Sequence, residues 1–166
     1  MIKVFSLLCL LISTALSQAS EPRSIQECGA LDNRKSVGWR FRLPVPEKAI
    51  VKKGSDVDYQ SYSIGYGDKK NRVWLWGGYG PTWSSGEVPN FLIESSKSYT
   101  ETKWAFADAR LGGGVDVKGQ LKNGNYWRFF GTVGQTAVYE DVSKQAADYF
   151  DSIIDNICYR KPSWAK

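Results

Sequence analysis

The stretch VDVKGQLKNGNYWRFFGTV (residues 115–133) decides the fold, because two strand-like runs flank a strong turn signal. Asn123-Gly124 is the residue pair that most readily adopts the positive φ angles of a two-residue hairpin turn. Apolar and polar residues alternate on both sides of this turn, as in strands with one buried face: Val115, Val117 and Leu121 before it, and Trp127, Phe129 and Val133 after it. We therefore predict a β-hairpin in the middle of a sheet, with Trp127 and Phe129 packed against a C-terminal helix.

A segment with helical periodicity follows the hairpin. In residues 142–159 the apolar side chains recur at the spacing of one helix face: Ala146, Phe150, Ile153, Ile154 and Ile157. Asp141 or Ser143 can cap its N-terminus, and Pro162 stops it. The sequence predicts an amphipathic helix that buries this stripe on one face of the sheet.

Further strands are expected before the hairpin. Residues 37–46 alternate strictly, with Trp39, Phe41, Leu43 and Val45 on one face. Residues 57–66 and 72–79 predict a second hairpin, and residues 99–111 a strand broken near Ala107, whereas 91–98 are ambiguous. Gly112-Gly113-Gly114 is expected to be a flexible link, and 47–56 a charged connection. The fold class is therefore α+β, with an antiparallel β-sheet of about six to eight strands and the C-terminal helix packed on one face.

The first 19 residues have the pattern of a secretory signal peptide. Lys3 precedes an apolar run at 4–16, and small residues follow it. Cleavage after Ser17 or after Ala19 fits, and an uncleaved anchor is the alternative. The run is too short to span a bilayer, and no later stretch approaches twenty apolar residues. We expect a secreted or periplasmic protein with no membrane span.

The remainder has the size of one domain. Residues 20–36 form a polar lead-in, and residues 37–161 a single α+β domain. The formal net charge of +5 falls to +4 without the leader, whose one charged residue is Lys3. Basic and acidic residues are interspersed, which indicates a solvated surface and argues against a nucleic-acid partner.

Two cysteines remain outside the leader, Cys28 and Cys158. In an exported chain they most simply form one disulfide, which would tie the start of the mature chain to the end of the last helix. Two free thiols are the alternative.

The chain contains no histidine. This excludes Ser–His–Asp and Cys–His catalysis and the usual histidine-bearing zinc sites, and it leaves paired carboxylates as the enzymatic option. Glu94, Glu101, Asp108 and Asp116 are candidates, with ion-pair partners for Arg110 and Arg128 as the structural alternative. Asp148, Asp151 and Asp155 are interpreted as a solvated face of the last helix. We expect no metal, no cofactor and no catalytic residue.

A run of aromatic residues is a more specific candidate for a binding site than these carboxylates. Trp74 and Trp76 share a strand face, and Tyr79 and Trp83 follow them. If this face is exposed, the rings could stack on a sugar or on a partner's apolar side chain. The alternative is that the two tryptophans form core beneath the helix.

The order of these elements resembles a known fold. An early strand with GWRFRLP (38–44) and a terminal AADYFDSIID helix (146–155), with strands and a hairpin between them, are similar to the PsbP-type α+β fold. The chain also resembles uncharacterised exported bacterial proteins. The resemblance implies a scaffold that often serves as a binding or assembly factor without catalysis.

These observations predict an exported, non-enzymatic binding or accessory protein of the cell envelope, whose partner is a protein or another envelope component. A carbohydrate-binding module that uses Trp74, Trp76, Tyr79 and Trp83 is one alternative. A carboxylate-based envelope hydrolase is the other.

Overall fold

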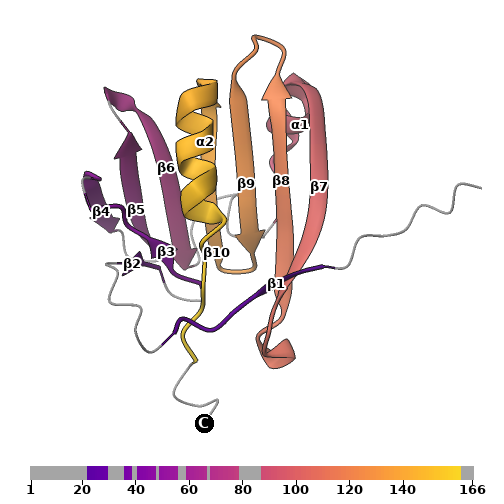
Figure 1. Cartoon of the computed structure of the whole chain (residues 1–166). Coiled ribbons are helices and arrows are strands. Elements are labelled where there is room, and N and C mark those ends of the chain that lie inside the picture. The colour runs from indigo at the N-terminus through magenta and orange to yellow at the C-terminus, as the bar shows by residue number, and fades with distance from the viewer. Residues whose placement is uncertain are drawn as a thin grey trace, which may run out of the picture.

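Strands dominate the computed structural model, which describes residues 22–29, 36–38, 41–47, 49–55, 59–66, 68–78 and 87–161 (Figure 1). The strands are β1 (Arg23–Ile25), β2 (Ser36–Val37), β3 (Leu43–Pro44), β4 (Val51–Ser55), β5 (Tyr59–Tyr66), β6 (Asp68–Gly78), β7 (Ser96–Phe106), β8 (Gly113–Leu121), β9 (Tyr126–Thr132) and β10 (Gln135–Val142). The helices are α1 (Asn90–Ser95), the 3₁₀ turn η1 (Ala109–Leu111) and α2 (Lys144–Ile154).

Eight of these strands form one sheet in the order β1-β7-β8-β9-β10-β6-β5-β4, and β2 and β3 form a separate ribbon. The α+β class is confirmed in outline, and the main sheet is at the upper end of the predicted size, but it is mixed and not antiparallel, because β1 pairs in parallel with β7. β1 lies in the lead-in that we expected to be polar. Its three residues carry one buried apolar side chain, Ile25, which is too little for a periodic signal.

The central hairpin is confirmed as β8 and β9, with Gln120 opposite Tyr126. Its turn is longer than the predicted two residues. The Leu121 amide donates to the Asn125 carbonyl, and the Gly124 amide to the Leu121 carbonyl. Among the described turn residues only Gly124 has a positive φ, 93°. The Asn123 amide side chain instead donates to the Asp141 carboxylate at 2.8 Å, which fastens the turn to the end of β10.

Apolar side chains cover both faces of the sheet. Phe130 belongs to the large core beneath α2, whereas Trp127 and Phe129 pack with Leu92 of α1 on the opposite face. The prediction that Trp127 and Phe129 contact the C-terminal helix is therefore wrong. In β9, neighbouring residues on both faces are buried, so alternation could not show which face meets which helix.

Helix α2 lies over β10, between β6 and β9 in Figure 1. The Ser143 hydroxyl caps it by accepting from the Ala146 amide, and the predicted apolar stripe is buried, including Ile157 beyond the end of the helix. In the structure α2 spans Lys144–Ile154. The helix ends there, five residues earlier than expected. The chain that follows is extended and bonds to two other segments, because the Cys158 carbonyl accepts from Arg42 and the Tyr159 carbonyl from Cys28, each at 2.7 Å.

The predicted disulfide is present. Cys28 and Cys158 are joined with their Cα atoms 5.0 Å apart. Cys158 lies in the extended segment after α2 and not at the end of the helix itself. A disulfide is typical of proteins that fold in an oxidising compartment outside the cytosol.

The predicted strand at 37–46 consists of two short strands, because the chain turns back after Gly38, whose φ is 116°. Phe41, Leu43 and Val45 are buried as the alternation predicted, and Trp39 lies outside the described residues. The Gln135 side chain holds this turn by bonding to both the amide and the carbonyl of Phe41.

Gly113 and Gly114 belong to β8, and the expected flexible link is wrong at these two positions. A Cβ atom on Gly114 would lie 1.9 Å from the Gly131 carbonyl oxygen and 2.8 Å from the Trp104 ring. The absence of a side chain thus lets β9 and the Trp104 indole approach β8 closely.

The remaining local predictions have mixed outcomes. The second hairpin is confirmed as β5 and β6, and the break near Ala107 is η1. The ambiguous stretch 91–98 divides between α1 and β7, and the charged connection 47–56 contains β4. Residues 1–19, the predicted signal peptide, lie outside the described residues. In the part that is described, no helix is long and apolar enough to cross a membrane.

Candidate functional site

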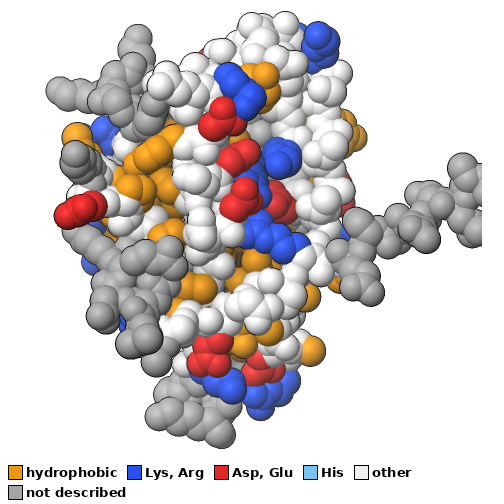
Figure 2. Space-filling view, viewed as in Figure 1, with side chains coloured by type: hydrophobic (Ala, Val, Ile, Leu, Met, Phe, Trp, Pro, Cys, Tyr) orange, Lys and Arg blue, Asp and Glu red, His pale blue; other side chains and the backbone are white. Residues whose placement is uncertain are grey.

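A polar groove runs beside α2, over β7, β8 and β9. We call it the α2 groove; two adjoining cavities of about 360 and 380 Å³ form it. Figure 2 shows acidic and basic side chains gathered in one band beside the helix. The side chains that matter below are Arg23, Thr100, Lys118, Gln120, Tyr126, Arg128, Lys144, Asp151 and Asp155.

The strand register explains why polar residues line this groove. Thr100 of β7 lies opposite Lys118 of β8, which lies opposite Arg128 of β9. These residues face the same side as Phe130, the side that α2 covers. Helix α2 contacts β10, β9 and β6, so its apolar stripe does not extend over β7 and β8. The uncovered strip carries hydroxyl and charged side chains instead.

Arg128 is the charged centre of the groove floor and is 1 % exposed. Its guanidinium donates two hydrogen bonds to the Asp116 carboxylate, from Nε to Oδ1 at 2.8 Å and from Nη2 to Oδ2 at 2.6 Å. It also donates to Asp151 of α2 at 2.9 Å and to Asp155, the C-cap residue of this helix, at 2.8 Å. One buried cation thus joins β8, β9 and the helix.

Arg23 of β1 adds a second guanidinium to the same cluster. It lies 3.3 Å from Asp155 and 3.6 Å from Asp116. It also donates to the carbonyls of Ile154 and Asp155 at 3.2 and 2.7 Å, and so satisfies the C-terminal end of α2. Two guanidinium groups therefore face three carboxylates, which leaves one excess negative charge in the cluster.

Burial and these charges shift the pKa values of the buried groups. Burial alone would lower the pKa of Arg128, but the bond to Asp116 and the charges of Asp116 and Asp151 raise it above its ordinary value. Burial, with the nearby Asp151 charge, raises the pKa of Tyr139, whose hydroxyl donates to Asp151 at 2.8 Å. Arg128 is therefore charged and Tyr139 neutral across the physiological pH range.

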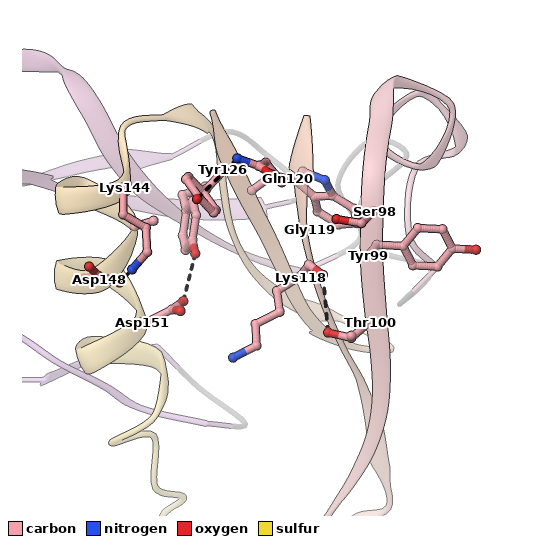
Figure 3. A pocket seen from close by; sticks show the side chains of 13 residues that line it. Ser98, Tyr99, Thr100, Lys118, Gly119, Gln120, Tyr126, Lys144, Asp148 and Asp151 are labelled. Atoms are coloured by element: carbon pink, nitrogen blue, oxygen red, sulfur yellow. Dashed lines mark hydrogen bonds and ion pairs between the residues drawn. The ribbon is translucent and has the colours of Figure 1, made fainter. Parts of the chain in front are cut away.

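Lys118 differs from the other charged groups of the groove. Its ammonium extends into the space between β8 and α2 (Figure 3), and it makes no ion pair within the described part of the chain. Lys144, at the opposite wall, is engaged with Asp148 of the same helix. The Tyr126 ring forms part of the wall between them, whereas the Tyr99 ring points away from the groove.

Two of the four carboxylates predicted as catalytic candidates are bound to arginines. Asp116 is held by Arg128, and Asp108 by Arg110, whose Nε and Nη2 donate at 2.9 and 2.6 Å. The structural alternative is confirmed for these two acids. The solvated-face interpretation is wrong for Asp151, which is half-buried against Arg128, whereas Asp155 is exposed as expected but also bonds to Arg128. Among the described residues, no cluster of three or more His, Cys, Asp or Glu side chains could hold a metal ion.

The Asp108 pair gives a prediction about acid stability. The bond from Arg110 lowers the pKa of Asp108 to about 2. An unfolded aspartate titrates near pH ~3.9, so the stabilisation is complete above that pH and is lost as the pH falls through about 2. We expect the free energy of unfolding of Asp108→Asn to fall less steeply than that of the wild type between these two pH values. Urea midpoints at pH 5, 4, 3 and 2 measure this, and parallel curves for the two proteins would contradict it.

The aromatic candidates are not brought together. Trp74 is 39 % exposed. It alternates with Val73 and Leu75, which belong to the core beneath α2, so its own side chain lies on the opposite face. The alternative that placed Trp74 beneath the helix is therefore wrong. For Trp76 only the backbone is described, and Tyr79 and Trp83 lie outside the described residues.

Sequence reasoning missed Lys118, Tyr126 and Lys144 as groove residues. The sequence did contain a signal for the first two. In the central hairpin the predicted apolar residues occupy one face, and Lys118, Tyr126 and Arg128 alternate with them on the other face. It could not be used without knowing that those positions face α2.

The chain matches no protein-family model, no curated protein sequence and no solved structure. The PsbP-type resemblance stays a prediction from the sequence.

Proposed function

We propose that this is an exported, non-enzymatic binding protein of the cell envelope that holds a small zwitterionic ligand in the α2 groove. The observation that carries the proposal is the ammonium of Lys118, which extends into the groove without an ion-pair partner among the described residues. A cation in this position offers three hydrogen-bond donors to an anionic group.

The neighbouring charge cluster favours a positive group on the ligand. Arg23 and Arg128 balance only two of the three carboxylates Asp116, Asp151 and Asp155. The Asp155 side chain is 54 % exposed and accessible to a ligand. A ligand with a carboxylate at Lys118 and an ammonium near Asp155 would complement both excess charges.

The size of the groove suits such a ligand. Its two cavities of about 360 and 380 Å³ adjoin at Thr100 and Lys118, and volumes of this order are typical of small-molecule sites. The half-buried Tyr126 ring offers an apolar wall and Thr100 a hydroxyl. Short peptides with free termini have this combination of charge and length, and they serve as probes.

Calorimetry with tri-alanine, its N-acetyl form and its C-terminal amide tests the proposal. We expect the free tripeptide to bind and each blocked form to bind more weakly. Lys118→Gln should lower the affinity for the free tripeptide by about tenfold or more, because a charge-assisted hydrogen bond is lost. Lys103→Gln is the matched control, since Lys103 lies on β7 and is turned to the other face of the sheet. Equal binding of all three forms would contradict the zwitterion, and no binding of any form would contradict the groove.

A carbohydrate-binding surface around Trp74 is the second candidate, because this ring is partly exposed on the face opposite α2. The hydrolase is less supported, since Asp108 and Asp116 are each bound by an arginine.

A further inference from the structure

The outer edge of β7 has a backbone partner over only part of its length. Within the described residues, β1 pairs with β7 from Trp104 to Phe106 and no further. Figure 1 accordingly shows β1 crossing one end of β7, while the rest of β7 is the outermost strand on that side. Residues 98–103 are all exposed along this edge.

Two hydrogen bonds fix the direction of the backbone groups on this edge. The Phe106 amide donates inward to the Gly112 carbonyl, and the Ala107 amide donates outward to the Ile25 carbonyl. Because successive residues of a strand alternate in this respect, Tyr99, Glu101 and Lys103 direct their N–H and C=O groups outward. The groups of Tyr99 and Glu101 can pair with another strand, whereas the Lys103 carbonyl lies beside Arg23, the first residue of β1.

We propose that this edge pairs antiparallel with the same edge of a second copy of the chain, across a two-fold axis at Thr100. The proposal does not depend on the ligand of the α2 groove. An isologous contact of this kind requires a self-complementary patch, and the sequence of β7 provides one.

On the groove face, the pairing places hydroxyl residues opposite one another. Thr100 meets Thr100 of the second copy, and Ser98 meets Thr102, pairs that are favourable in sheets. On the other face, Tyr99, which is 49 % exposed, meets Glu101. Glu101 also lies diagonal to Lys97 of the second copy, within reach of these long side chains.

One contact is unfavourable. Lys103 comes opposite Lys97 of the second copy at each end of the paired segment. The register of β7 shifts between Ser96 and Ser98, so Lys97 lies in a bulge where pairing with a second strand ends. This repulsion limits the affinity and supplies a test of the register.

The pairing would join the eight strands of each copy into one continuous sheet. The two α2 grooves would then lie on the same face and open toward each other across the paired β7 strands. A contact of so few residues falls below about 1,200 Å² of buried surface, which is the range of weak, reversible interfaces.

Sedimentation equilibrium of the purified protein tests the proposal. We expect a reversible dimer at concentrations of about 0.1–1 mM. Glu101→Pro should abolish it, because proline removes an outward N–H without removing a bond to β8. Glu101→Ala is the matched control and should keep the dimer, since it retains that N–H. A wild-type protein that stays monomeric at 1 mM would overturn the proposal; an edge that serves a different protein would give this result. A dimer that persists in Glu101→Pro would overturn it as well.

Charge reversal tests the register. Lys103→Glu should tighten the dimer about fivefold, because two Lys–Lys oppositions become Glu–Lys pairs, and Glu101→Lys should weaken it by a similar factor. A dimer whose affinity does not respond to Lys103→Glu would overturn the axis at Thr100.

Discussion

Replacing Arg128 with methionine is expected to lower the free energy of unfolding by about 3–5 kcal/mol, because it leaves buried carboxylates without their cation. Asp116 has side-chain exposure of only 9 % and loses both bonds of its bidentate pair. Asp151 and Asp155 lose their link to β9 at the same time. Urea denaturation followed by circular dichroism measures the change.

Three further variants separate charge from packing in this cluster. Arg128→Lys keeps the charge but not the bidentate geometry and should fall between wild type and Arg128→Met. Adding Asp116→Leu to Arg128→Met should recover part of the loss, because it removes the most deeply buried unpaired carboxylate. Arg110→Gln is the control, an arginine whose own side chain is 61 % exposed, and its effect should be smaller than that of Arg128→Met. A change below about 1 kcal/mol in Arg128→Met would show that water replaces the guanidinium.

The elements with strong local signals were predicted well. The Asn123-Gly124 turn joins two regular strands, and the spacing of Phe150, Ile153 and Ile154 predicted α2 together with its Ser143 cap. The end of the helix was not predictable from its period, because Ile157 continues the apolar spacing. What ends α2 is tertiary: Arg42 and Cys28 bond to the backbone of residues 158 and 159.

The predictions that were wrong concern features that depend on contacts between segments distant in the sequence. β1 has three residues and gains its place through parallel pairing with Trp104–Phe106, far along the chain. The assignment of Trp127 and Phe129 to the α2 face failed because β9 buries both of its faces. The sequence did indicate that Arg128 partners acidic residues, but not that Asp116, Asp151 and Asp155 would converge on it from two elements.

The second large effect concerns the disulfide. Replacing Cys28 and Cys158 together by serine is expected to lower the free energy of unfolding by about 4–5 kcal/mol on the chain-entropy account, because the bond closes a loop between residues 130 positions apart. The bond joins two segments that otherwise meet through few backbone bonds, among them Cys28 N–H to the Tyr159 carbonyl. Urea denaturation of the double variant and of the oxidised wild type gives the difference.

Amide hydrogen exchange distinguishes a global loss from local detachment of β1. If the bond acts mainly on the unfolded chain, amide exchange in β9 and β10 should be faster in the variant, in proportion to its loss of global stability. If it acts by holding β1 in place, the Ala107 amide, which donates to the Ile25 carbonyl, should lose protection first. The wild type treated with dithiothreitol is the control and should match the double serine variant. Oxidised wild type and variant with equal urea midpoints would contradict the prediction, and would show that the packing of Ile25 and Tyr159 suffices to hold the two ends together.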